Sequence, residues 1–329
     1  MQRGNFVNRR KFLASSGAGV MAVSGITAVS GLAAHAQHGE SSHPGDGPQN
    51  AAKIFKSVKW GMVQTEGSVM DKFRLQKELG FDGVELNSPS SIDKQAVLEA
   101  SRELDMPVHG VVDSVQWHQR LSSPDPAIRK KGLDALRTAI DDSHLFGGSS
   151  VLFLPGKVSG PDETHDDIWK RSVPEIRKVL PQAAKKGIRI LIENVWNGFC
   201  ETPEQLCDYV DEFDSPWIGV YFDIGNVVKF SPSEQWIRTL GSRIVKLDVK
   251  DWGQENGFCK IGDGDVNWPA VREALAEIKF TGWCTGEVAG GDRIRLQEVA
   301  ERMDRALGLA APKSFSESNF GKAAEINIR

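Results

Sequence analysis

The sequence predicts a single-domain α/β protein, a closed (β/α)8 TIM barrel, preceded by an export signal and a linker. Eight short apolar segments alternate with amphipathic helical stretches over about 250 residues, which matches the repeat of this barrel. An open doubly wound sheet is the competing fold, and it usually carries a glycine-rich phosphate loop after its first strand. Here the first strand leads into Gln64-Thr65-Glu66-Gly67, which favours the closed barrel. The strands are expected at Lys59–Val63, Gly83–Asn87, Pro107–Val112, Ser150–Leu154, Arg189–Glu193, Ile218–Asp223, Arg243–Lys250 and Gly282–Glu287.

Residues 1–36 have the features of a twin-arginine signal peptide. Arg9 and Arg10 precede a Lys-Phe-Leu sequence and a weakly apolar stretch, and Ala34-His35-Ala36 is a small-x-small cleavage site. These features predict the twin-arginine translocase as a partner during export, and a periplasmic or otherwise exported protein without stable membrane association. An uncleaved membrane anchor stays open, although the Gly and Ser content of the stretch makes it a weak span.

The remaining chain divides by composition. Residues 37–54 are rich in Gly, Pro and polar residues and are expected to form a flexible linker. Residues 55–312 are expected to form the barrel, and residues 313–329 a C-terminal tail.

Helix boundaries are marked by caps and prolines. A capping residue before an early Pro is expected at Asp125-Pro126. Capping boxes with Pro at the first helical position are expected at Thr202-Pro203-Glu204-Gln205 and Ser231-Pro232-Ser233-Glu234. Gly80 and Gly187 stand where a helix should end. Pro174 and Pro181 predict a break in the helix over 166–186.

Charge and cysteine content narrow the class of function. The chain has 40 basic and 44 acidic residues, and the first 36 residues contain four of the basic ones and no acid. The mature protein is therefore acidic, which argues against a nucleic-acid partner. The spacing of the four cysteines matches no zinc-binding pattern. A disulfide between Cys200 and Cys259 is a possibility that the sequence leaves open. Assembly into a homo-oligomer is left open as well.

Four acids stand at the carboxyl ends of four consecutive predicted strands, namely Glu193, Asp223, Asp248 and Glu287. Strand ends of this type converge on one mouth of a barrel, where its active site lies. Four carboxylates at close range need a cation or strongly raised pKa values, so a divalent metal site is predicted. All-oxygen ligands favour Mn²⁺ or Mg²⁺, with Co²⁺ and Zn²⁺ as alternatives. Salt bridges to Lys246 and Lys250 are the structural alternative for individual acids.

Further side chains near the same mouth are candidates for substrate binding. Trp117, Trp196 and Trp252 fall in loops after predicted strands, where flat rings suit the C–H faces of a sugar. His109 either faces the mouth or is a core histidine. Lys246 and Lys250 either hold a developing oxyanion or neutralise the acids.

The chain from about 59 to 309 resembles the xylose isomerase-like TIM barrel superfamily, in particular its sugar phosphate isomerase/epimerase branch. The matching motifs are Gly80-Phe81-Asp82-Gly83-Val84-Glu85-Leu86, Ile192-Glu193-Asn194, Phe222-Asp223-Ile224-Gly225-Asn226, Val249-Lys250-Asp251, the Gly262/Gly264 loop and Glu287. The resemblance implies that the four acids bind one divalent metal and that Asn226 lies at the substrate. The family usually has His at the positions of Asp248 and Asn226, which leaves the reaction open.

The resemblance implies a metal-dependent sugar isomerase or epimerase that acts through an enediolate. Glu193 and Glu287 are then the catalytic residues, one removing a proton next to a carbonyl and the other returning it. Two alternatives stay open: a lyase that drives elimination on 3-keto glycosides or inositol derivatives, and a non-catalytic sugar-binding barrel. The endonuclease IV-like branch uses several His ligands, which the late strands lack.

Overall fold

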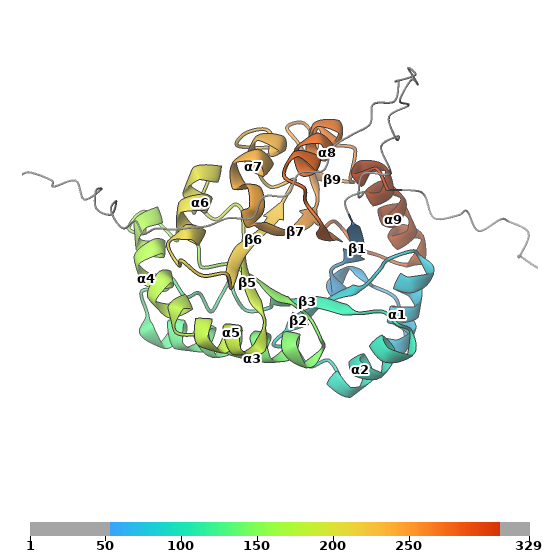
Figure 1. The fold of residues 1–329 in the computed structure, drawn as a ribbon, viewed down its shortest axis with the longest axis horizontal. Coiled ribbons are helices and arrows are strands. Elements are labelled where there is room, and N and C mark those ends of the chain that lie inside the picture. Colours follow the sequence, from blue (N-terminus) through green and yellow to red (C-terminus); the bar gives the residue numbers. More distant parts are fainter. Residues whose placement is uncertain (1–52, 310–329) are drawn as a thin grey trace, which may run out of the picture. The chain divides into compact units, whose positions relative to one another are not determined.

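The structure, a computed structural model, describes residues 53–309, so the predicted signal peptide and C-terminal tail lie outside the described residues. Eight parallel strands form one sheet in which consecutive barrel strands are neighbours (Figure 1). The last strand pairs with the first along its full length, and a single bridge between Lys59 and Glu85 joins the first strand to the second. The predicted (β/α)8 barrel is therefore confirmed. Its strands are β1 (Ile54–Val58), β2 (Val84–Ser88), β3 (Val108–Asp113), β4 (Ser150–Phe153), β5 (Arg189–Glu193), β6 (Ile218–Asp223), β7 (Ile244–Val249) and β10 (Gly282–Gly286).

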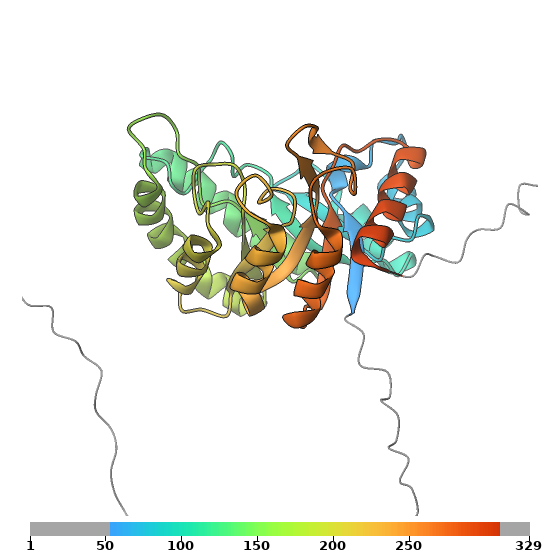
Figure 2. The ribbon, with the colours of Figure 1, turned by 90° about the horizontal axis from the view of Figure 1, so that it is seen from above.

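The helices form the outer layer around these strands (Figure 1). They are α1 (Val69–Glu78), α2 (Lys94–Glu103), α3 (Pro126–Leu145), α4 (His165–Arg177), α5 (Leu180–Lys186), α6 (Pro203–Asp211), α7 (Ser233–Leu240), α8 (Trp268–Glu277) and α9 (Arg293–Leu307), with short 3-10 turns at Trp60–Met62 and Gly241–Arg243. A short hairpin of β8 (Asp251–Gly253) and β9 (Gly257–Cys259) follows β7 and projects at one end of the barrel (Figure 2). Apolar side chains fill the space between sheet and helices.

The first strand lies five residues earlier than the sequence predicted. Residues 54–58 form β1, whereas most of 59–63 forms the 3-10 turn and the loop around it. The strand contains Lys56, whose ammonium group is buried and pairs with Asp304 of α9 at 2.6 Å. Because this partner lies on the last helix, no local pattern marks the lysine as a core residue.

Most of the predicted helix signals are confirmed. Asp125 caps α3, and Thr202 forms a reciprocal capping box with Gln205 at the start of α6. The predicted break separates α4 from α5 just before Pro181, whereas Pro174 lies inside α4 without ending it. Gly187 ends α5 with a left-handed φ of 70°. The capping box at Ser231 is wrong, because its hydroxyl instead accepts a hydrogen bond from Trp236 Nε1 at 2.7 Å.

The four cysteines are free thiols in the described part of the chain. Cys200 is buried and lies near His165 Nε2, with 3.9 Å between sulfur and nitrogen, whereas Cys259 is the last residue of β9. The disulfide considered between them is therefore not formed, since Cys200 packs toward α4 and α6. Within residues 53–309 no helix is long and apolar enough to cross a membrane.

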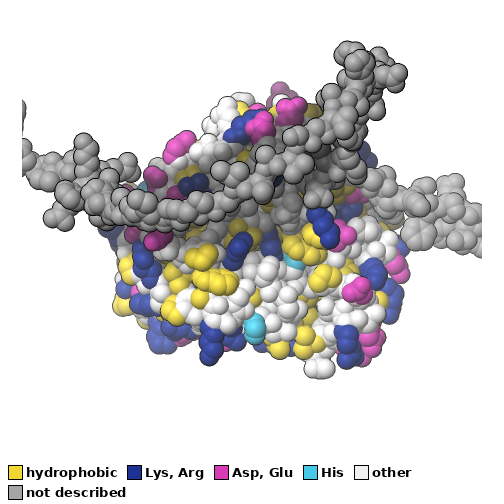
Figure 3. Space-filling view, in the orientation of Figure 1, with side chains coloured by type: hydrophobic (Ala, Val, Ile, Leu, Met, Phe, Trp, Pro, Cys, Tyr) yellow, Lys and Arg dark blue, Asp and Glu magenta, His cyan; other side chains and the backbone are white. Residues whose placement is uncertain are grey.

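Charged side chains of both signs share the surface. On the face drawn in Figure 3, Lys and Arg are interspersed with Asp and Glu around the edge of the barrel. Several form ion pairs, such as Arg238 with Glu277 at 2.6 Å and Arg243 with Asp211 at 2.6 Å.

Candidate active site

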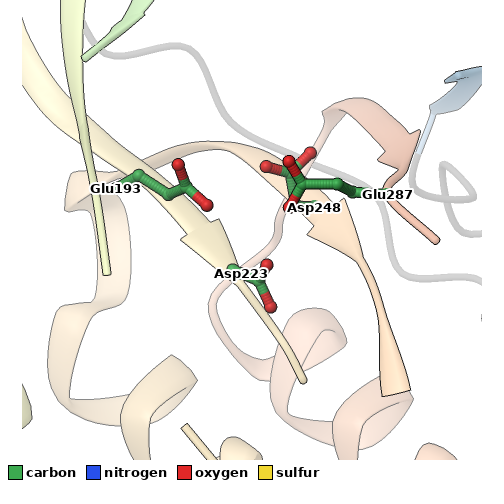
Figure 4. Close-up of side chains that lie close together, drawn as sticks. All are labelled: Glu193, Asp223, Asp248 and Glu287. Carbon is green, nitrogen blue, oxygen red and sulfur yellow. The ribbon is translucent and has the colours of Figure 1, made fainter. Parts of the chain in front are cut away.

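The four predicted acids meet at the carboxyl ends of the late strands. Glu193 ends β5, Asp223 ends β6, Asp248 lies near the end of β7, and Glu287 follows β10 directly. One carboxylate oxygen from each lies within 4.8 Å of those of the others. Figure 4 shows Glu193 and Glu287 reaching toward each other from opposite sides, with Asp223 beside them. The strand ends therefore build one compact cluster, as the sequence predicted.

Two lysines are inserted between these acids. Lys250 Nζ lies 2.9 Å from Asp223 and 2.6 Å from Glu287. Lys59 Nζ lies 2.8 Å from Asp248 and 2.9 Å from Glu85, a buried acid of β2. The two ammonium groups thus pair with four carboxylates, whereas Glu193 makes no ion pair among the described residues, and a surplus of negative charge remains.

The pKa values of the acids reflect this surplus. Burial, reinforced by Glu287, raises the pKa of Glu193 well above its ordinary value. Burial also raises the pKa of Asp223 to about 6 and that of Asp248 well above its ordinary value, although a lysine beside each opposes the shift. Burial acts in the same sense on Glu287, but Lys59 and Lys250 outweigh it and hold the pKa of that carboxyl below its ordinary value.

The acid cluster has the donor chemistry of a divalent metal site. Its ligand atoms are all oxygens, which suits hard cations such as Mn²⁺ and Mg²⁺. A divalent ion would also neutralise most of the negative charge that the two lysines leave unbalanced. Glu193, Asp223, Asp248 and Glu287 therefore fit the predicted metal.

Two asparagines fix the ends of β5 and β6. Asn194 exchanges hydrogen bonds with the backbone of Asp223, at 2.8 and 2.9 Å. Asn226 donates its backbone N–H to the Asp223 carboxylate at 2.8 Å and its amide N–H to the Asn194 carbonyl at 3.0 Å. Asn226 is buried, and its backbone N–H holds the Asp223 carboxylate in position. The backbone of Gly225, the residue before Asn226, lies close to the backbone of Lys250. A Cβ added to Gly225 would lie 2.8 Å from the Lys250 carbonyl oxygen.

His109 and Lys246 lie inside the barrel, away from the mouth. They are only 3% and 2% exposed, and Lys246 Nζ bonds His109 Nδ1 at 2.9 Å. His109 Nε2 is bonded to Ser57 at 2.8 Å. Burial lowers the pKa of Lys246 to about 7 and that of His109 well below its ordinary value. The structure thus places these two predicted substrate-binding side chains inside the barrel, where their polar atoms pair with each other and with Ser57.

The three predicted loop tryptophans lie at two different places. Trp117 lines a cavity of about 300 Å³ that also touches Glu193, Lys250 and Glu287. Trp196 instead packs on Phe258 of the hairpin, with 4.8 Å between ring centroids, and on Trp252, with 5.8 Å. Its indole N–H donates to the Asn226 carbonyl at 2.6 Å. Of the predicted sugar platforms, only Trp117 lines this cavity.

Several site residues escaped the sequence analysis. Lys59 was missed because the first strand was placed too late, and Glu85 was named only within the family motif, without a role at the site. Strand alternation puts Glu85 and Asn87 on one face of β2, and this signal could have found both. Asp113 was missed because the predicted strand stopped one residue before it. It is the last residue of β3 and lines the cavity.

Comparison with known proteins identifies the family. The family model of the xylose isomerase-like TIM barrel matches the sequence over residues 73–308. The chain belongs to this family. L-ribulose-5-phosphate 3-epimerase of Escherichia coli O1:K1 is 26% identical over 273 residues, which cover 78% of this chain and 92% of that enzyme.

Two solved structures of the same fold are similar over most of their length. D-allulose 3-epimerase from Methylomonas sp. superposes with a TM-score of 0.60 at 21% identity, covering 72% of this chain and 84% of that one. 3-keto-D-glucoside 4-epimerase from E. coli gives a TM-score of 0.64 at 16% identity, covering 77% and 99%. At these identities the likeness extends to the fold.

Proposed function

We propose that the protein is a divalent-metal-dependent sugar epimerase or isomerase that moves a proton next to a carbonyl group. The observation that carries the proposal is the pair Glu193 and Glu287, which touch the same cavity from opposite sides of the four-acid cluster. The similarity to L-ribulose-5-phosphate 3-epimerase supports the same class of reaction. Glu193, Asp223, Asp248 and Glu287 would hold the ion.

The ion, when bound, would polarise the substrate carbonyl and acidify the neighbouring C–H bond. One glutamate removes the proton from that carbon, which leaves an enediolate, and the other glutamate returns a proton. Return to the opposite face of the same carbon gives an epimer, and return to the neighbouring carbon gives an aldose–ketose isomer. Lys250, at 2.6 Å from Glu287, fixes the orientation of that carboxylate.

Proton exchange in D₂O tests this function. The purified protein is incubated with a series of ketoses and with 3-keto glycosides, with and without Mn²⁺, and deuterium at the carbon next to the carbonyl is followed by NMR. We expect deuterium uptake with formation of an epimer or isomer only when metal is present. Release of the aglycone would instead assign the elimination reaction. No exchange with any ketose in the presence of Mn²⁺, Mg²⁺ or Co²⁺ would contradict the proposal.

We also propose that the protein is exported in the folded state by the twin-arginine translocase. The proposal is supported by the sequence of residues 1–36 alone. Because lysine lacks the planar guanidinium group, an Arg9→Lys, Arg10→Lys double variant is expected to stay in the cytoplasm. Cell fractionation measures this, and an unchanged periplasmic yield would favour a general secretory signal or an anchor.

A further inference from the structure

The cavity has a second wall that the proposed proton transfer does not use. Asn87 on β2, Asp113 at the end of β3, and Gln116 and Trp117 in the loop after β3 line it. This wall faces the same space as Glu193, Lys250 and Glu287. A substrate held at the acids would therefore extend its remaining atoms toward the early strands.

Asp113 is the unusual residue of this wall. Its side chain is 1% exposed, and one carboxyl oxygen accepts the backbone N–H of Val115 at 3.1 Å. The other oxygen is buried and has no hydrogen-bond partner among residues 53–309, where the carboxyl group also forms no salt bridge. A buried carboxyl oxygen without a partner is costly, and a hydroxyl group entering the cavity would satisfy it.

The neighbours of Asp113 suit the other features of a sugar. Trp117 is 41% exposed and offers a flat apolar ring to the cavity. Gln116 accepts the backbone N–H of Leu154 at 2.7 Å, which fixes its amide group in the wall. A carboxyl, two amides and one aromatic ring are the mixture that binds hydroxyl groups on one side and C–H groups on the other.

The charge of the cavity opposes a phosphate group. Three acids line it, Asp113, Glu193 and Glu287, against the single cation Lys250, which is already paired with two carboxylates. A divalent ion bound at the cluster would offset this surplus of two negative charges, so the lining would still offer a phosphate no net positive charge. A phosphate ester carries about −1.5 to −2 charges near neutral pH and is normally bound by Arg, Lys or a helix N-terminus.

We infer that the substrate is an uncharged sugar without phosphate, whose hydroxyl groups away from the reacting carbon are bound by Asp113 and whose apolar face lies on Trp117. This inference rests on the proposed function. The inferred substrate differs from that of the relative named L-ribulose-5-phosphate 3-epimerase, whose name specifies a phosphorylated sugar. Asp113 serves this selection because its carboxyl group binds a hydroxyl group, and the wall around it contains no cation that would bind a phosphate.

Equilibrium binding tests the inference without requiring turnover. Titration calorimetry of the Mn²⁺-loaded protein compares D-fructose, D-tagatose and D-allulose with the 6-phosphate of each sugar and with inorganic phosphate. We expect at least one free sugar to bind about ten-fold or more tightly than its phosphate ester. In Asp113→Asn, affinity for the free sugar should fall about ten-fold, because a charged hydrogen-bond acceptor is lost, and the preference over the ester should shrink.

The controls separate this inference from the proposed function. Glu255→Gln removes one acid from the exposed turn of the β8–β9 hairpin, outside the cavity, and should leave all affinities unchanged. A free sugar that binds but exchanges no proton in D₂O would leave the inference standing and refute the proposed function. A phosphate ester that binds or exchanges better than its parent sugar would overturn the inference, as would binding of neither or an unchanged affinity in Asp113→Asn.

Discussion

The two sides of the cavity differ in how their carboxyl groups are paired. We call the side with Glu193 and Glu287, together with the acids beside them, the late-strand wall, and the side with Asp113 and Trp117 the early-strand wall. On the late-strand wall, Asp223 and Glu287 share Lys250, and Asp248 shares Lys59 with Glu85. On the early-strand wall, Asp113 has one backbone N–H as its partner among the described residues and makes no ion pair there. Three of the four late-strand acids are therefore held by lysines, whereas the early wall leaves one carboxyl group to be satisfied by a ligand.

This difference corresponds to two tasks. Proton transfer next to a carbonyl requires fixed carboxylates and strong local charge, and the lysine-bridged cluster provides both. Recognition of hydroxyl groups requires acceptors whose hydrogen bonds are not already used within the protein. Charge pairing in one wall and its absence in the other are thus expected where a site separates catalysis from recognition.

The largest expected effect is on the late wall. Glu287→Gln keeps an oxygen ligand and a similar volume but removes a group that accepts a proton. General acid–base catalysis contributes about 10²–10⁴-fold, so turnover should fall by at least that order. Glu193→Gln should behave alike, and the double variant should lose far less than the product of the two, because both residues serve one proton-transfer sequence. Steady-state kinetics with the best ketose measures these losses.

Metal content must be determined for the same samples. Weakened coordination alone would lower turnover together with bound Mn²⁺, whereas loss of proton transfer leaves the metal in place. If Glu287→Gln kept both its metal and near-normal turnover, proton removal by that residue would be excluded. A hydride shift, in which the carboxylates act as ligands only, would then be the better account.

The second effect concerns the two buried lysines at β1. Lys59→Met leaves Asp248 and Glu85 without their cation, and breaking a buried ion pair costs about 3–5 kcal/mol of unfolding free energy. Lys56→Met should cost a similar amount, since it strands Asp304 at α9. Added Mn²⁺ should restore much of the stability of the Lys59 variant, because the ion returns positive charge to the cluster, and should give the Lys56 variant less. Denaturant unfolding with and without Mn²⁺ measures both.

This pair of variants also checks the metal site itself. Equal stabilisation of both variants by Mn²⁺ would mean that the ion does not compensate the charge lost at Lys59. Failure of Mn²⁺ to stabilise even the wild-type protein would refute metal binding at the four acids. Lys56 is the appropriate control because it lies three residues before Lys59, is also buried and pairs with one acid outside the cluster.

The third effect is the pH dependence of stability caused by Asp113. Burial raises the pKa of this carboxyl to about 7, whereas its unfolded value is near 3.9. The folded protein therefore holds one more proton than the unfolded chain between these values, so this group makes stability fall as pH rises from about 4 to 7. Three pKa units correspond to about 4 kcal/mol.

In Asp113→Asn this part of the pH dependence is absent. The difference in unfolding free energy between variant and wild type should therefore shift in favour of the variant by up to about 4 kcal/mol between pH 4 and pH 8. Any cost of the amide itself is the same at both pH values and cancels. Urea unfolding of the metal-free proteins provides the values, and a difference that does not change with pH would mean an ordinary pKa for Asp113.

The late wall could be predicted from the sequence because each of its acids ends a strand that is readable locally. Glu193 and Asp223 follow runs of apolar, β-branched or aromatic residues, so both the strand and its end are visible. Parallel strands in a barrel bring these ends together, whatever the loops do. The position of the acid cluster therefore follows from strand order alone.

The early wall and the lysines could not be predicted in the same way. Lys59 acquires its role from Asp248, far along the chain, and from the bridge that closes the barrel at Glu85. His109 and Lys246 are fixed by each other across the barrel, so their distance from the mouth depends on strand stagger. Pairings of this kind depend on the register between strands, which the residue pattern of one strand alone does not reveal.

The smallest expected effect distinguishes two tryptophans with similar exposure. Trp117 lines the cavity, whereas Trp196 packs on the hairpin. An aromatic platform contributes about 0.5–1.5 kcal/mol beyond the area that it buries, so Trp117→Ala should raise KM for the free sugar several-fold. The chemical step should be unchanged, because the ring binds the ground state and the transition state alike. Trp196→Ala should leave KM nearly unchanged, and Trp252→Ala likewise, since neither ring lines the cavity. A larger KM change in Trp196→Ala than in Trp117→Ala would move the sugar-binding wall to the hairpin and reverse the division between the two walls.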